Sequence, residues 1–299
     1  MVDVRRGGLA VALLGPAEVR ELAERLDVTP TKKLGQNFVI DGNTVRKIVR
    51  LAGVQHTDRV LEVGPGLGSL TLGITETGAD VTAVEIDHRL AAELPHTIAA
   101  MQPDAAARFR VIRSDALDVS LDHLTAEGPP PEVLVANLPY NVSVPILMHL
   151  LELLPGLRSA LVMVQAEVGY RIAAGPGSKE YGAPSAKAAW YGRWHIAGTV
   201  SRQIFWPIPG VDSVLVAYEK AATSLGSEEE RAATFDLVNA AFAGRRKMLR
   251  QSLQGVRGVP QTADAASEVI ASACIDPTLR AEQLSIEQFL AIARALSSV

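Results

Sequence analysis

An apolar segment that runs directly into a glycine-rich loop is the feature that most constrains how this chain can fold. Residues 60–63 are apolar enough for a buried strand, and Gly64, Gly66 and Gly68 follow them at G-x-G-x-G spacing. Glycine lets a backbone turn sharply and approach a ligand closely, because it carries no Cβ. Residues 81–85 predict the next strand, which ends in a carboxylate. The sequence therefore predicts a ligand site at the carboxyl ends of a parallel sheet.

The alternation of strands and helices continues to about residue 220. Further strands are predicted at residues 109–113, 133–136, 161–164, 198–204 and 214–218, and helices at 16–26 and 43–51, the second capped by Asp41 or Asn43. This order predicts an α/β fold with a Rossmann-like, largely parallel sheet and helices on both faces. No helix separates the last two strands, so they can pair antiparallel at that edge.

A polar stretch over residues 223–230 ends the alternation. Beyond it only helices are predicted, at residues 229–243, 246–253, 262–273 and 286–296. We therefore expect two domains, an α/β domain over residues 1–220 that carries the ligand site and a small helical domain over residues 221–299.

Composition excludes several classes of protein. With 48% apolar and 21% charged residues, and no apolar run of about 18 residues, the chain lacks the features of a membrane protein. A short apolar stretch near the amino end is followed by no evident cleavage site, so we do not expect secretion. The single Cys274 cannot form an internal disulfide, which suits the cytoplasm. The six histidines show no metal-ligand spacing, so no metal is expected.

The spacing of the glycine loop separates three kinds of nucleotide site. A P-loop needs a lysine after its last glycine, but Ser69 follows Gly68 here. A dinucleotide site has G-x-G-x-x-G spacing. The spacing here, with Glu62 before it, resembles that of class I S-adenosylmethionine methyltransferases. In such a site Glu85 can accept hydrogen bonds from two ribose hydroxyls, and Asp115 can accept one from an adenine amino group.

A second motif, Asn137-Leu138-Pro139-Tyr140, follows the strand predicted at residues 133–136. It resembles the signature of methyltransferases that act on exocyclic amino groups. Such a nitrogen is a poor nucleophile, because its lone pair is delocalised into the ring. The Asn137 side-chain oxygen and the Leu138 carbonyl can each accept one N–H, which directs the lone pair at a methyl donor. Pro139 suits a tight turn after this strand, and Tyr140 can stack on the flat base that carries the amino group.

Together with these motifs, three further segments resemble the KsgA/RsmA family of ribosomal RNA adenine N6,N6-dimethyltransferases, over about residues 29–295. They are residues 33–38 (Lys-Leu-Gly-Gln-Asn-Phe), residues 205–213 (Phe-Trp-Pro-Ile-Pro-Gly-Val-Asp-Ser) and the basic segment from residue 241. The resemblance implies that Phe205 stacks on the target base opposite Tyr140. It also implies S-adenosylmethionine as the cofactor, bound by Gln36, Asn37, Val39, Gly64, Gly66, Glu85, Asp115 and Asn137.

Nucleic-acid contacts must come from local clusters, because the net charge of the chain is −4. No acidic residue lies between Asp236 and Asp264, whereas several basic ones do. On a helix, Arg246 and Arg250 would share a face that could meet phosphates. The RNA-binding candidates are Lys32, Lys33, Arg245, Arg246, Lys247 and Arg250.

The resemblance implies dimethylation of two adjacent adenines near the 3′ end of 16S rRNA in the immature 30S subunit, in the cytoplasm, by a monomer. Three alternatives stay open: a large-subunit dimethyltransferase that confers antibiotic resistance, a mainly non-catalytic small-subunit assembly factor, and a nicotinamide oxidoreductase. Two departures from the family pattern, Ala166 before Glu167 and the pair Ala183-Pro184, remove positive charge from the expected RNA face.

Overall fold

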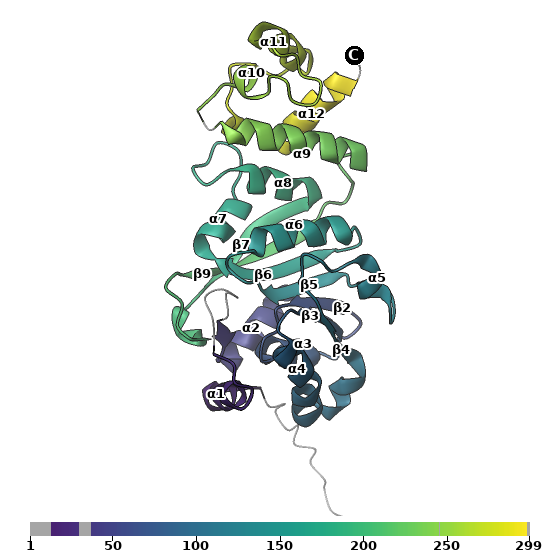
Figure 1. Cartoon of the computed structure of the whole chain (residues 1–299), viewed down its shortest axis with the longest axis vertical. Coiled ribbons are helices and arrows are strands. Elements are labelled where there is room, and N and C mark those ends of the chain that lie inside the picture. Colours follow the sequence, from purple (N-terminus) through teal and green to yellow (C-terminus); the bar gives the residue numbers. More distant parts are fainter. Residues whose placement is uncertain (1–12, 30–36, 245, 298–299) are drawn as a thin grey trace, which may run out of the picture. The chain divides into compact units, whose positions relative to one another are not determined.

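The computed structural model describes residues 13–29, 37–244 and 246–297. Its main sheet has seven strands in the order β4-β3-β2-β5-β6-β9-β7 (Figure 1). The strands are β2 (Arg59–Val63), β3 (Asp80–Glu85), β4 (Phe109–Arg113), β5 (Val133–Asn137), β6 (Ser159–Gln165), β7 (Gly192–Val200) and β9 (Ser213–Lys220).

Five strands form the parallel part of this sheet. β2 pairs in parallel with β3 on one side and with β5 on the other, and further parallel pairs join β3 to β4 and β5 to β6. The Ala221 N–H donates to the Tyr191 carbonyl, so the end of β9 lies beside the start of β7, and these two strands are antiparallel. The α/β sheet predicted from the sequence is thus confirmed. Because the chain order reverses between β2 and β5, a crevice is expected at their carboxyl ends.

Helices α1 (Pro16–Arg25) and α2 (Gly42–Ala52) precede the parallel part of the sheet. Its strands are connected by α3 (Ser69–Thr75), α4 (His88–Met101), α5 (Leu121–Thr125) and α6 (Ser143–Leu153). The predicted cap at Asp41 is confirmed, since its carboxylate accepts the Thr44 N–H at 2.8 Å. Asp41 caps the start of α2, and this helix ends at Gly53, whose φ of 65° lies in the left-handed region that favours glycine.

Two short strands, β1 (Phe38–Val39) and β8 (Phe205–Trp206), form a separate antiparallel pair. Phe38 lies opposite Trp206 and Val39 opposite Phe205. The pair joins two segments that are more than 160 residues apart in the sequence. It brings Phe38 and Val39, which follow a predicted cofactor residue, beside the start of the motif at residues 205–213 that is predicted to bind the base.

The described residues fall into two compact units. One contains the chain up to Val164 and Thr199–Leu215, and the other contains Gln165–Gly198 and the chain from Val216 onward. The predicted division at residue 221 differs from this grouping and remains a proposal. No helix in these residues is both long and apolar enough to cross a membrane.

The second unit is mainly helical. It contains α7 (Ala166–Ile172), α8 (Ala183–Tyr191), α9 (Glu228–Ala243), α10 (Leu249–Ser252), α11 (Ala263–Ser272) and α12 (Ile286–Ser297), of which the last four gather in one group in Figure 1. Their apolar faces share one core, in which Leu237 of α9, Ile270 of α11 and Phe289 of α12 are completely buried. The helical character predicted after residue 221 is confirmed.

Two predicted elements were wrong. The strand predicted at residues 198–204 begins at Gly192 and ends at Val200, because the Ser201 side chain accepts the Gln203 N–H and starts a short 3₁₀ turn. The helix predicted at residues 246–253 covers only α10. A turn in which the Lys247 N–H donates to the Gly244 carbonyl precedes it, so Arg246 and Lys247 do not lie on a helix.

Candidate functional site

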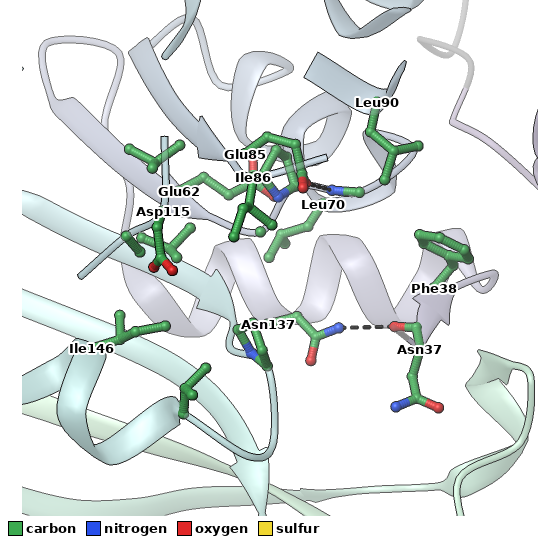
Figure 2. Close-up of a pocket in the computed structure, with 18 of the residues that line it drawn as sticks. Asn37, Phe38, Glu62, Leu70, Glu85, Ile86, Leu90, Asp115, Asn137 and Ile146 are labelled. Atoms are coloured by element: carbon green, nitrogen blue, oxygen red, sulfur yellow. Dashed lines mark hydrogen bonds between the residues drawn. The ribbon is translucent and has the colours of Figure 1, made fainter. Parts of the chain in front are cut away.

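A cavity of about 220 Å³ opens at the carboxyl ends of the parallel strands, where the fold predicts a crevice. Its walls come from the glycine loop after β2, from the ends of β3 and β5, from β1, and from the loop after β4 (Figure 2). Of the predicted cofactor residues, those that line it are Asn37, Val39, Gly64, Gly66, Glu85, Asp115 and Asn137.

The glycine loop has the conformation that its sequence predicts. Gly64, Gly66 and Gly68 all have positive φ, at 67°, 60° and 94°. A Cβ on Gly66 would lie 2.9 Å from the ring of Phe38, closer than real Cβ atoms approach other atoms. Glycine at position 66 is therefore required both by the backbone conformation and by the close approach of Phe38.

Glu85 holds this loop in place. Its Oε2 accepts the Gly66 N–H at 3.0 Å, and its Oε1 accepts the Asp87 N–H at 2.9 Å. The side chain is 4% exposed, and burial raises its pKa despite these hydrogen bonds. A carboxylate oxygen can accept a second hydrogen bond, so both oxygens remain able to accept from vicinal hydroxyls.

Asp115 lies in the loop after β4. Its Oδ1 accepts the Leu117 N–H at 2.9 Å, so its other oxygen can accept from a ligand. Two large apolar side chains line the same part of the cavity and are exposed, Ile86 at 52% and Leu117 at 38%. Exposed apolar side chains beside a carboxylate suit a flat ring that carries an amino group. The sequence analysis missed Ile86 and Leu117, although each closely follows a predicted acidic residue.

Glu62 also lines the cavity, and the sequence analysis did not include it among the site residues. It is 1% exposed, and its Oε2 has no hydrogen-bond partner in the described part of the chain. Burial raises the pKa of Glu62 to about 8, the nearby Glu85 adds to the rise, and the Thr71 hydroxyl opposes it. A protonated carboxyl group at the cavity wall, with no partner for Oε2 among the described residues, can form a hydrogen bond with a polar group of a bound ligand.

The side-chain amide of Asn137 has a defined orientation. Its Nδ2 donates to the main-chain carbonyl of Asn37 at 3.0 Å, as the dashed line in Figure 2 shows. Its Oδ1 is buried and has no hydrogen-bond partner among the described residues. An acceptor left in this state at the edge of the cavity can take an N–H from a bound group.

The rest of this motif is held by the sheet and by a neighbouring strand. Leu138 is completely buried, and its N–H donates to the Met163 carbonyl at 3.1 Å. Pro139 lines the cavity. The Tyr140 hydroxyl lies 2.7 Å from Ser213 Oγ, and burial raises the pKa of Tyr140. Ser213, which is 1% exposed, was given no role in the sequence analysis, although it closes the motif at residues 205–213.

Phe205 is 1% exposed and does not line this cavity. Its neighbour Trp206 is half-buried, whereas Ile208 and Val211 in the same segment are exposed. The stacking role of Phe205 stays a prediction, and it requires the ring to become accessible when the base binds.

The remaining candidates lie outside the cavity. Arg246 and Lys247 are exposed, and Arg250 is half-buried in α10. Gln36, Lys32, Lys33 and Arg245 lie outside the described residues.

The chain is similar to known proteins over most of its length. The family model described as ribosomal RNA adenine dimethylase matches residues 29–298. A protein of Leifsonia xyli, named ribosomal RNA small subunit methyltransferase A, is 63% identical over 281 residues, which cover 94% of this chain and 98% of that protein. A protein of Streptomyces coelicolor with the same name is 54% identical and covers 94% and 96%.

Two solved structures share the fold. A dimethyladenosine transferase from Plasmodium falciparum superposes with a TM-score of 0.71 at 22% identity, over 85% of this chain and 95% of that one. The 23S rRNA methyltransferase ErmE superposes with a TM-score of 0.62 at 25% identity, over 87% and 100%. The chain therefore belongs to the ribosomal RNA adenine dimethylase family and is an S-adenosylmethionine-dependent rRNA adenine dimethyltransferase.

Proposed function

We propose that this enzyme dimethylates the N6 amino groups of two adjacent adenines near the 3′ end of 16S rRNA in the immature 30S subunit. The observation that carries the chemistry is the buried Oδ1 of Asn137 beside the cofactor cavity, which has no hydrogen-bond partner in the part of the chain that the structure describes. The names of the Leifsonia and Streptomyces relatives support the small subunit as the source of the substrate.

In this proposal Asn137 and Leu138 prepare the target nitrogen. The cofactor supplies an electrophilic methyl group. Asn137 Oδ1 accepts one N6–H and the Leu138 carbonyl accepts the other, which turns the nitrogen lone pair toward the cavity. No strongly basic side chain is required, because the proton becomes acidic only once the nitrogen carries positive charge. Tyr140 and Phe205 stack on the two faces of the base, worth about 1–3 kcal/mol per stacked base.

The cofactor residues have separate proposed roles. Glu85 accepts hydrogen bonds from the ribose hydroxyls, and Asp115 accepts one from the adenine amino group between Ile86 and Leu117. The remaining residues hold the methionine end, and they are Gln36, Asn37, Val39, Gly64, Gly66 and the main chain of Asn137. The Glu62 carboxyl group, whose Oε2 has no partner among the described residues, can form a hydrogen bond with a polar group of this end.

RNA phosphates are proposed to meet the exposed Arg246 and Lys247, with further contacts from Lys32, Lys33, Arg245 and Arg250. Replacing Lys247 by alanine should lower the slope of log affinity against log salt by about 0.7–0.9, the share of one phosphate contact. Arg257 is the matched control, because an ion pair of 2.9 Å to Asp236 already neutralises it. An Arg257→Ala variant should leave the slope unchanged.

The family model and the curated relatives also bear on the alternatives. The large-subunit enzyme has support only from the likeness to ErmE at 25% identity, against 63% for a small-subunit relative. A nicotinamide oxidoreductase does not agree with the family shown. We further propose that the enzyme acts in the cytoplasm as a monomer and contributes to ribosome biogenesis.

The test is transfer of labelled methyl groups from S-adenosylmethionine to immature small subunits that lack the modification. We expect dimethyladenine at two neighbouring positions with the wild type, transfer slower by about 10²–10³-fold with Asn137→Ala, and none on immature large subunits. Label on large subunits alone would support the resistance enzyme. Tight binding to small subunits without any label would support the assembly factor, and the Ala166 and Ala183-Pro184 segments would then be restored to the family pattern.

A further inference from the structure

We propose that the β1–β8 strand pair couples the cofactor cavity to the target-base site, with Phe38 and Trp206 as positioning residues. Their packing holds the main-chain carbonyl of Asn37 against the amide of Asn137. The inference rests on the proposed role of Asn137 and adds a device that orients it.

The contact between Asn37 and Asn137 decides which end of the amide faces the substrate. A main-chain carbonyl can only accept a hydrogen bond, so the atom of Asn137 that faces it at 3.0 Å must be the donor nitrogen. The opposite orientation would bring two oxygens together. The carbonyl of Asn37 therefore fixes Oδ1 of Asn137, which has no partner within the described residues, as the atom that meets the target amino group.

The position of Asn37 is set by the strand pair that begins at the next residue. Phe38 and Val39 pair with Trp206 and Phe205, and the Ile40 N–H donates to the Ile204 carbonyl at 2.8 Å. The rings of Phe38 and Trp206 stack, with their centroids 6.2 Å apart and their planes 26° from parallel. A two-residue ladder is too short to be stable alone, so this ring contact supplies much of what holds it.

The same strand pair also reaches the cofactor. Phe38 is 6% exposed, lines the cavity and packs against Gly66 of the glycine loop. A ligand that fills the cavity would contact Phe38, which in turn packs against Trp206. Phe205, the proposed base platform, precedes Trp206 on the same strand. The strand pair therefore lines the cofactor cavity, directly follows the residue that contacts the Asn137 amide, and contains the proposed base platform.

The test separates turnover from binding in a Trp206→Ala variant. We expect the rate of methyl transfer at saturating cofactor and RNA to fall by about 10–100-fold, because a small displacement of an orienting group costs rate. Cofactor affinity should fall by a smaller factor than the rate, since Phe38 still lines the cavity and Trp206 does not. Trp206→Phe keeps a ring to stack on Phe38 and should restore most of the rate.

Trp194→Ala is the matched control. Trp194 is also packed on an aromatic ring, that of Tyr218 at 4.7 Å, but it belongs to the second compact unit. This variant should lose stability without losing rate per folded molecule. An equal loss of rate in the two variants would assign Trp206 a general structural role and overturn the inference.

A double-mutant cycle tests whether Trp206 acts through Asn137. In the Asn137→Ala background, Trp206→Ala should lower the residual rate by less than about twofold, because its target is already gone. Full additivity of the two losses would contradict the inference. Failure of the proposed function is separate, since it would show as wild-type transfer in Asn137→Ala alone.

A measurement on the wild type covers the case in which Trp206→Ala does not fold. S-adenosylhomocysteine should change the tryptophan emission of the wild type, and this change should be absent in Trp206→Phe, which retains Trp190 and Trp194. An identical change in both proteins would show that the cofactor does not act on Trp206.

Discussion

The cofactor side and the target-base side of this site differ in how far the chain satisfies its own polar groups. On the cofactor side, both oxygens of Glu85 and one of Asp115 accept main-chain N–H groups, and Gly66 is fixed by its φ and by Phe38. On the target side, Oδ1 of Asn137 is buried without a partner among the described residues, and Ile208 is 68% exposed.

This difference indicates two ways of building a binding site. On the cofactor side, hydrogen bonds already hold Glu85 and Asp115 in the structure without a ligand, so these residues can bind at small cost in conformational entropy. The target side keeps a buried acceptor, Oδ1 of Asn137, which has no partner among the described residues and gains one only when a base enters. Its interactions are thus available for the transfer step rather than used in the resting protein. Glu62 and Ser69 are exceptions on the cofactor side, because Glu62 Oε2 and Ser69 Oγ also have no hydrogen-bond partner among the described residues.

The largest effect is expected on the target side, from Asn137→Ala. Loss of the acceptor for the amino group should lower methyl transfer by about 10²–10³-fold, in line with the removal of other preorganised polar groups. Cofactor affinity should change by no more than about threefold, because the main chain of residue 137 is retained. Single-turnover transfer and calorimetric titration of the cofactor measure the two quantities. A parallel loss of both would remove the distinction between the two sides.

On the cofactor side the pattern should be the reverse. Gly66→Ala puts a side chain at a φ of 60° and within 2.9 Å of Phe38, so cofactor affinity should fall by about 10–100-fold. Gly53→Ala is the matched control, since Gly53 has a φ of 65° but no heavy atom within 4 Å of the added Cβ. It should cost about 1 kcal/mol of stability and leave cofactor affinity unchanged. Titration of both variants separates backbone strain from loss of the cavity wall.

Much of the cofactor side could be predicted from the sequence, because its residues are local. A strand, a glycine loop and a carboxylate at the end of the next strand lie within 26 residues, and their roles follow from their order. The strand at residues 109–113 and the helix that begins near residue 229 were predicted to within one residue. Periodicity and capping explain this success.

The contacts that build the target side could not be predicted. Asn37 and Asn137 are 100 residues apart, and Tyr140 and Ser213 are 73 residues apart, so no local pattern joins them. The start of β7 is a different case. Arg193, Trp194 and His195 alternate between exposed and buried, a period that indicates a strand and that the sequence analysis passed over.

A smaller effect is expected from Glu62→Gln. The folded protein holds the proton of Glu62 up to about pH 8, above the ordinary pKa near 4.5, so wild-type stability that is present below pH 4.5 is lost as the pH rises toward 8. The glutamine variant lacks this loss. The difference in free energy of unfolding between the variant and the wild type should therefore rise by about 1 kcal/mol per pH unit between pH 6 and 7. Urea unfolding at several pH values measures the difference.

The matched control is Glu127→Gln, which makes the same replacement at an exposed side chain, where no burial is involved. If Glu62→Gln ran parallel to the wild type, Glu62 would be ionised in the folded protein. Its carboxylate would then have hydrogen-bond partners, as that of Glu85 has, and Glu62 would no longer be an exception on the cofactor side.

The smallest effect is expected from Tyr140→Phe, which keeps the ring for stacking and removes only the hydroxyl. The lost hydrogen bond to Ser213 is worth about 0.5–1.5 kcal/mol, so KM for RNA should rise severalfold while the rate at saturation stays near that of the wild type. Ser213→Ala removes the other partner of the same bond and should give the same KM. A much larger effect in Tyr140→Phe than in Ser213→Ala would mean that the hydroxyl itself meets the RNA. The target side would then contain a second group that finds its full set of partners only when the base is bound.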